Sequence, residues 1–184
     1  MRLTIYYTSD NPLGLDAWWE ILLVGLGIPF LGIFLSAASD NPVWKIICLL
    51  LISIPLGLIS APWLGNVSGS ILYTAGTFTL GITITLTALG VIFPATFASI
   101  GGGLMVALAL LVIVRILQIF IPALTVLGWI DYLAAGLFSL YIAHDMAKAY
   151  EMPKTITNAV MVSFEMYLNI FNLFINIVKI LSND

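Results

Sequence analysis

Residues 43–64 read VWKIICLLLISIPLGLISAPWL, a run in which the one charged residue is Lys45. A helix needs about 20 apolar residues to cross the hydrocarbon core of a bilayer, so this stretch predicts a transmembrane α-helix. The whole chain has the same character, because 61% of its 184 residues are hydrophobic and only 8% are charged. So few charges cannot cover a water-facing surface. The sequence therefore predicts an integral membrane protein.

Five further apolar stretches of similar length flank this one. The six predicted spanning helices are Ala17–Ala38, Val43–Leu64, Ser70–Phe93, Ile100–Ile121, Thr125–Asp145 and Ile156–Leu181. Proline, glycine and polar residues, which end helices, fill the short breaks. The predicted fold is all-α, a polytopic transmembrane helical bundle. Residues 1–16 are predicted to form an extramembrane N-terminal segment, and residues 17–184 a single transmembrane helical domain.

The lysines indicate an orientation. An even number of spanning helices places both termini on one side, together with Arg2 and Lys179, whereas Lys45, Lys148 and Lys154 fall on the other side. The positive-inside rule then places the termini outside and the three lysines in the cytoplasm.

Two faces of the predicted helices carry small or polar residues. The stretch 70–93 has a small-residue face, predicted to be a packing seam, made of Ser70, Thr74, Thr77, Gly81, Thr85 and Ala88. The last helix carries Glu165, Asn169, Asn172 and Asn176 at spacings that place them on one face, which Lys179 extends. This stripe is either a seam of hydrogen-bonded amides or the wall of a polar cavity.

The end of the fifth helix should meet this stripe. If the last two helices form an antiparallel hairpin centred near Thr157, counting places Asp145 level with Asn169 and Lys148 level with Glu165. A carboxylate at that height would find hydrogen-bond donors on the stripe. The alternative is that Asp145 simply ends its helix at the cytoplasmic interface.

Arg115 lies in an apolar stretch, where an ionisable group needs an explanation. A hairpin turning near Leu124 brings it close in height to Asp131, and Glu20 is a second candidate partner. A structural ion pair between Arg115 and Asp131, or a snorkelling arginine, is favoured over a transport role.

The sequence contains no pattern typical of an enzyme. It has one His and one Cys, too few for a metal-ligand cluster, and no nucleophile elbow or glycine-rich phosphate loop. It also has no basic cluster typical of nucleic-acid binding. We therefore expect a protein that is not an enzyme, has no cofactor or metal site, and binds no nucleic acid.

Four short segments resemble one family. Residues 136–145, GLFSLYIAHD, and residues 166–174, MYLNIFNLF, resemble the penultimate-helix and last-helix signatures of the Bax inhibitor-1 family, also known as the lifeguard or transmembrane BAX inhibitor motif family. Residues 72–78, LYTAGTF, and 100–105, IGGGLM, resemble two of its middle segments. The order and spacing of the family hold from about Val43 to Leu181, three quarters of the chain.

The resemblance implies a helical fold of about seven spanning segments, so this chain would lack the family's first helix. It also implies a proton sensor of two aspartates that gates a cation leak, chiefly of Ca²⁺. Asp145 matches the first aspartate, but Asn169 stands where the second is expected. Glu165, one turn earlier on the same face, is the candidate replacement. The resulting candidate ion pathway and gate consists of Asp145, Asn169, Glu165 and Asn172.

The predicted function is therefore a pH-modulated Ca²⁺ leak channel whose partners are the lipid bilayer and the permeant cations. The alternative is a non-conducting membrane modulator that binds a membrane protease or cell-death proteins. The expected location is the plasma or inner membrane for a bacterial or viral source, and the endoplasmic reticulum or Golgi for a eukaryotic one.

Overall fold

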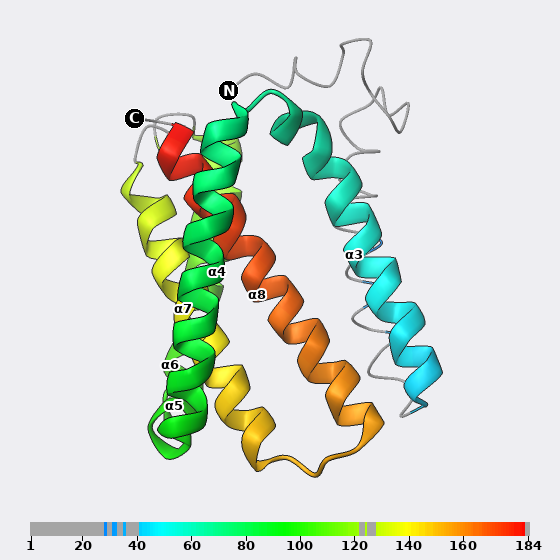
Figure 1. Ribbon diagram of the computed structural model, residues 1–184. Coiled ribbons are helices and arrows are strands. Elements are labelled where there is room, and N and C mark those ends of the chain that lie inside the picture. The colour runs from blue at the N-terminus through cyan, green and yellow to red at the C-terminus, as the bar shows by residue number, and fades with distance from the viewer. Residues whose placement is uncertain are drawn as a thin grey trace. The chain divides into compact units, whose positions relative to one another are not determined.

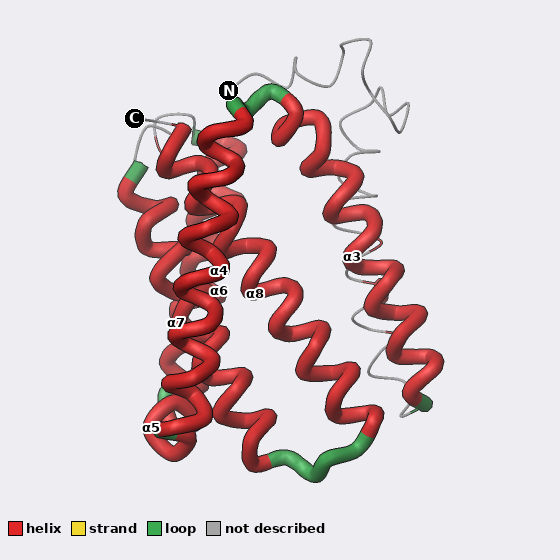
Figure 2. Tube along the Cα trace, in the orientation of Figure 1, coloured by secondary structure: helices red, strands yellow, loops and turns green. Residues whose placement is uncertain are grey.

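The computed structural model of the chain describes residues 28, 31–32, 35, 41–121, 124 and 128–182. The longer elements within these residues are all helices, and no strand occurs among the described residues (Figures 1 and 2). In chain order they are α3 (Pro42–Gly65), α4 (Gly69–Ile92), α5 (Pro94–Ser99), α6 (Gly101–Phe120), α7 (Trp129–Glu151) and α8 (Ile156–Ser182). The all-α fold predicted from the sequence is confirmed for this part of the chain.

Four of these helices are long and apolar enough to cross a membrane: α3, α4, residues Gly101–Gln118 of α6, and α8. The ends of each lie within three residues of the ends of a stretch that the sequence predicts to span. Of the other two predicted spans, Ala17–Ala38 lies mostly outside the described residues. The count of six spanning helices, and the absence of the family's first helix, stay predictions.

The fifth predicted stretch differs from the helix that forms there. The sequence predicts Thr125–Asp145, whereas α7 begins at Trp129 and continues to Glu151. Asp145 therefore does not end its helix. The last turn tolerates charge because Lys148 lies near the partial negative charge of the helix C-terminus. Beyond it, the Lys154 ammonium donates to the carbonyls of Ala149 and Tyr150, at 2.9 and 3.0 Å.

A short helix that the sequence did not predict, α5, connects α4 to α6. Phe93 leaves the helical conformation, and Pro94 then begins α5 at a position where its missing N–H costs nothing. The predicted break between the third and fourth apolar stretches thus contains a six-residue helix.

The chain divides into two compact units, Met1–Ser68 with Thr155–Met161, and Gly69–Lys154 with Val162–Asp184. In the first, α3 begins after Asn41, whose side chain accepts a hydrogen bond from the Val43 amide at 2.9 Å. Pro55 and Pro62 lie inside α3 without ending it, as transmembrane helices allow.

In the second unit, α7 is the central helix, which packs against α4, α5 and α6. Its buried residues recur along the helix at Ile130, Asp131, Ala134, Leu137, Phe138, Ile142, Ala143, Asp145 and Ala147. α4 and α7 approach each other closely at Gly90 of α4, where a Cβ atom would collide with the Ala143 carbonyl oxygen.

This packing corrects one prediction about α4. Its buried residues are Ala75, Thr79 and Gly90. The predicted seam is largely turned away from the neighbouring helices, since Thr77, Gly81, Thr85 and Ala88 are exposed. The prediction failed because threonine hydroxyls in this helix donate to the carbonyl four residues earlier, as Thr77 and Thr85 do, and so need no partner helix.

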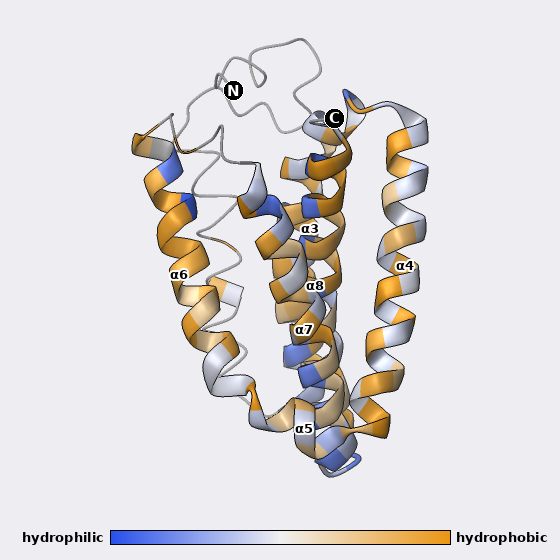
Figure 3. Cartoon of the chain, turned by 90° about the vertical axis from the view of Figure 1, so that its left-hand side faces the viewer, coloured by the Kyte–Doolittle hydropathy of each residue, from blue (hydrophilic) through white to orange (hydrophobic). Residues whose placement is uncertain are grey.

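Large apolar side chains cover the outside of the helices. On α6, Met105, Val106, Leu110, Ile113 and Phe120 are each more than half exposed. Figure 3 shows hydrophobic colour along most of this helix. Such a surface suits lipid as the solvent, and the protein is an integral membrane protein.

Candidate functional site

Two clusters of polar residues join α7 to α8, and they lie at different heights along these helices. Residues 152–155 connect the two helices. Higher residue numbers on α8 meet lower numbers on α7, so the two helices run antiparallel. The hairpin predicted from the sequence is therefore present, with its turn a few residues before Thr157.

The first cluster, here called the carboxylate cluster, consists of Asp145, Lys148, Glu165 and Asn169. The amide Nδ2 of Asn169 donates to Asp145 Oδ2 at 2.5 Å. Both side chains are buried, with exposed fractions of 4% for Asp145 and 8% for Asn169. A donor on α8 thus compensates part of the cost of removing the α7 carboxylate from water.

One turn nearer the connecting loop, the Lys148 ammonium faces Glu165. The nitrogen lies 3.8 Å from Glu165 Oε2, and about a third of each side chain is exposed. That distance is too long for a hydrogen bond, and Glu165 Oε2 is buried with no hydrogen-bond partner among the described residues. Glu165 also lies close enough to Asp145 for the two charges to interact.

The charges of this cluster do not balance. Two carboxylates face one ammonium, so the ionised cluster carries an excess negative charge. An unbalanced charge in a low-dielectric setting attracts a counter-ion. The arrangement can therefore stabilise a cation near Asp145, and Glu165 Oε2, which accepts no hydrogen bond from the described residues, could contact one.

The polar contact of His144 is with α5 and not with these carboxylates. Its Nδ1 lies 2.8 Å from the carbonyl oxygen of Phe97 in α5. Its ring also contacts Gly101 at the start of α6, where a Cβ atom would be 2.5 Å from the ring. His144 therefore connects α7 to α5 through this polar contact and packs against the start of α6. Among the described residues, no group of three or more His, Cys, Asp or Glu residues is placed to hold a metal ion.

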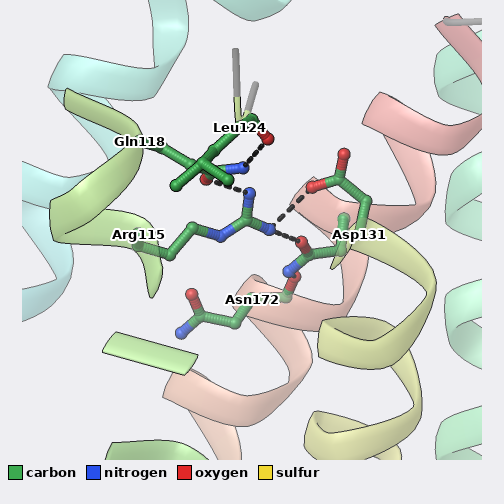
Figure 4. A network of polar contacts seen from close by, with 6 residues as sticks. Arg115, Gln118, Leu124, Asp131 and Asn172 are labelled. Atoms are coloured by element: carbon green, nitrogen blue, oxygen red, sulfur yellow. Dashed lines mark hydrogen bonds and ion pairs between the residues drawn. The ribbon is translucent and has the colours of Figure 1, made fainter. Parts of the chain in front are cut away.

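The second cluster, here called the arginine cluster, joins three helices around Arg115 of α6 (Figure 4). One guanidinium nitrogen, NH2, donates to Asp131 Oδ1 at 2.6 Å and to Asn176 Oδ1 at 2.8 Å. The other, NH1, donates to Gln118 Oε1 at 3.2 Å. Gln118 in turn donates to the carbonyl of Leu124 at 3.0 Å. The structure thus brings Arg115 and Asp131 together, and the other proposed partner, Glu20, lies outside the described residues.

Sequence reasoning missed two members of this cluster. Asn176 was placed on the polar stripe but was not paired with Arg115, although the stripe runs toward it. Gln118 lies three residues after Arg115 on the same helix, a spacing that brings side chains together. Asn172, predicted to be part of the gate, donates to the carbonyl of Leu168 at 2.8 Å, one turn back along its own helix.

An apolar layer separates the two clusters. On α7, Ala134, Leu137, Phe138 and Ile142 are buried between Asp131 and Asp145. On α8, Leu173 is fully buried between Asn169 and Asn176. The polar stripe of α8 is therefore not a continuous wall in this arrangement, since an apolar side chain fills the space between its two hydrogen-bonding amides.

The chain matches one family model over almost its full length. A model described as "Inhibitor of apoptosis-promoting Bax1" matches residues 3–184. No curated protein matches the chain. The matched range includes both polar clusters and every described helix.

Proposed function

The chain belongs to the Bax inhibitor-1 family, and from this premise we propose that it is a cation leak channel, chiefly for Ca²⁺, gated at the carboxylate cluster. The permeant cations and the surrounding bilayer are its proposed partners. The proposed activity is transport, so it requires neither catalysis nor a cofactor, and it involves no nucleic acid. We further propose that the protein crosses the membrane several times.

The observation that carries this proposal is the buried hydrogen bond between Asp145 and Asn169. Ionisable groups within the membrane are costly and usually mark ion pathways. This bond lies between two helices, so a small movement of α8 away from α7 would break it. The freed carboxylate, together with Glu165, would then present negative charge to a cation entering from that end.

We propose that the described arrangement is the closed state, which the apolar layer supports. A hydrated ion that crossed this layer would have to displace buried apolar side chains such as Ile142 and Leu173. Breaking the Asp145–Asn169 contact would loosen the hairpin one turn away from Leu173. The proposed gate is therefore the hydrogen bond, and the proposed barrier is the apolar layer beside it.

We propose that pH acts through Asp145 and Glu165. Two carboxylates that interact compete for one proton, because like charges at close range disfavour double ionisation. Asn169 stands where the resemblance to the family implies a second aspartate, and an amide cannot take part in proton sharing. The remaining sharing partner is Glu165, whose Oε2 has no hydrogen bond among the described residues.

The test is Ca²⁺ entry into dye-loaded liposomes that contain the purified protein. Asp145→Asn removes the buried charge while keeping the side-chain shape, and we expect it to lower the leak several-fold. Glu151→Gln is the matched control, because it makes the same chemical change at an exposed residue at the end of α7. A wild-type leak equal to that of empty liposomes would refute conduction.

A second candidate function is favoured by the apolar layer. If that layer never opens, the protein is a non-conducting modulator that binds a membrane protease or cell-death proteins. A liposome assay without leak, combined with cross-linking of the intact protein to such a partner in its native membrane, would support this alternative.

A further inference from the structure

Lys179 of α8 lies near the arginine cluster, and together they contain more positive than negative charge among the described residues. Arg115 and Lys179 lie close enough to each other and to Asp131 for their charges to interact. Asp131 is the one carboxylate of the group. Lys179 forms no hydrogen bond or ion pair with any described residue. Among the described residues, two cations therefore face one carboxylate.

The cluster lies near the same end of three helices. Arg115 is five residues before the end of α6, Asp131 is two residues after the start of α7, and Lys179 is three residues before the end of α8. At 1.5 Å per residue these residues lie within about 8 Å of the helix ends. From this depth in helices that cross a membrane, the long side chains of Arg115 and Lys179 can reach the level of the lipid headgroups.

An apolar groove leads from this level toward the middle of α6 and α7. It has a volume of about 310 Å³ and is lined by Ala107, Leu110, Leu111, Val114, Trp129, Ile130, Leu133 and Leu137. Val114 and Ile130 directly precede Arg115 and Asp131 in the chain, so the groove ends beside the cluster. Trp129 is 55% exposed at that end, where indole rings favour the membrane interface.

From the excess cation and the adjoining groove, we infer that the arginine cluster and the α6–α7 groove together bind one anionic phospholipid. Its phosphate would accept hydrogen bonds from Lys179 and from the free N–H groups of Arg115, and an acyl chain would lie in the groove. The phosphate supplies a negative charge beside Arg115 and Lys179, and the acyl chain covers apolar surface between α6 and α7. This inference does not depend on whether the protein conducts ions.

The experiment is native mass spectrometry of the full chain, released from detergent after titration with phosphatidylglycerol or with phosphatidylcholine of identical acyl chains. We expect the anionic lipid to be retained preferentially. Lys179→Met should weaken its binding about fivefold, the effect of one basic residue at a charged membrane surface. Lys45→Met, which removes a lysine from α3, is the matched control and should bind as the wild type does.

Two further variants guard against a folding defect. Lys179→Arg keeps the charge and should retain the lipid. Ala107→Phe fills the groove without changing any charge, and it should weaken phosphatidylglycerol binding while leaving the helical circular dichroism unchanged. Equal binding of both lipids, or equal loss in the Lys45→Met control, would overturn the inference. So would displacement of the lipid by millimolar inorganic phosphate, since that would assign the site to a free anion.

Discussion

The ion pair between Arg115 and Asp131 can be tested by a double-mutant cycle. The two changes are Arg115→Leu, which leaves the Asp131 carboxylate without its guanidinium, and Asp131→Asn, which leaves Arg115 with neutral acceptors only. The exposed fractions of the side chains are 31% for Arg115 and 12% for Asp131. The pair is therefore neither a surface salt bridge nor a fully buried one.

The expected costs follow from that intermediate burial. Breaking a buried pair costs about 3–5 kcal/mol, and breaking a surface pair costs about 1 kcal/mol or less. Arg115→Leu should cost about 3 kcal/mol, because it leaves a nearly buried carboxylate and also removes the hydrogen bonds to Gln118 and Asn176. Asp131→Asn should cost about 2 kcal/mol, since Arg115 keeps those two acceptors. The double mutant should cost about 3 kcal/mol, which is less than the sum, because it contains no unpaired charge.

The measurement is equilibrium unfolding of the purified protein in mixed micelles as the fraction of denaturing detergent rises, followed by circular dichroism. Lys148→Met, which lies in the other cluster, should add independently to Asp131→Asn and so serves as the uncoupled control. If the double mutant loses as much stability as the two single mutants together, Arg115 and Asp131 do not stabilise the fold as a pair.

Three further outcomes are expected. In the liposome assay, Asn169→Asp should make the Ca²⁺ leak respond more steeply to pH between roughly 6 and 8, because it places a second carboxylate against Asp145. If the wild-type leak already responds steeply and Glu165→Gln does not change this response, Glu165 is not the pH sensor. Gly90→Ala should destabilise the protein by about 1–3 kcal/mol, because its Cβ would overlap a backbone carbonyl of α7. The control Gly81→Ala, with no atom within 4 Å of the added Cβ, should not destabilise in the same unfolding titration. A tag on the C-terminus should be labelled from outside sealed cells, and labelling seen only after permeabilisation would reverse the predicted topology.

The sequence predicted helices well where apolar length alone determines them. The predicted stretches Val43–Leu64 and Ile156–Leu181 correspond to α3 and α8, with ends shifted by at most one residue. It predicted α7 poorly, because a rule based on apolar length stops at the first cluster of charges. The helix continues past Asp145 because its backbone hydrogen bonds do not depend on side-chain polarity, and because Asn169 compensates the buried carboxylate.

Counting residues along the predicted hairpin was enough to predict which residues of the site lie at the same height. Equal heights placed Asp145 beside Asn169 and Lys148 beside Glu165, and both contacts are present. Counting gives height but not rotation around a helix. The contact of His144 with Phe97 therefore could not be predicted, since it depends on where α5 lies.

The amides of α8 have a consequence for how the protein is made. Asn169 and Asn176, the partners of Asp145 and Arg115, are contributed by α8, the helix that follows all the others described. Arg115 lies 16 residues from Asp131 but 61 from Asn176, so during synthesis the ion pair can form well before its amide partner exists. Until α8 enters the membrane, Asp145 lacks the hydrogen-bond donor that Asn169 provides, and Arg115 lacks the acceptor that Asn176 provides. The insertion of one helix completes both clusters at once, which makes it the step that separates an immature chain from a finished one.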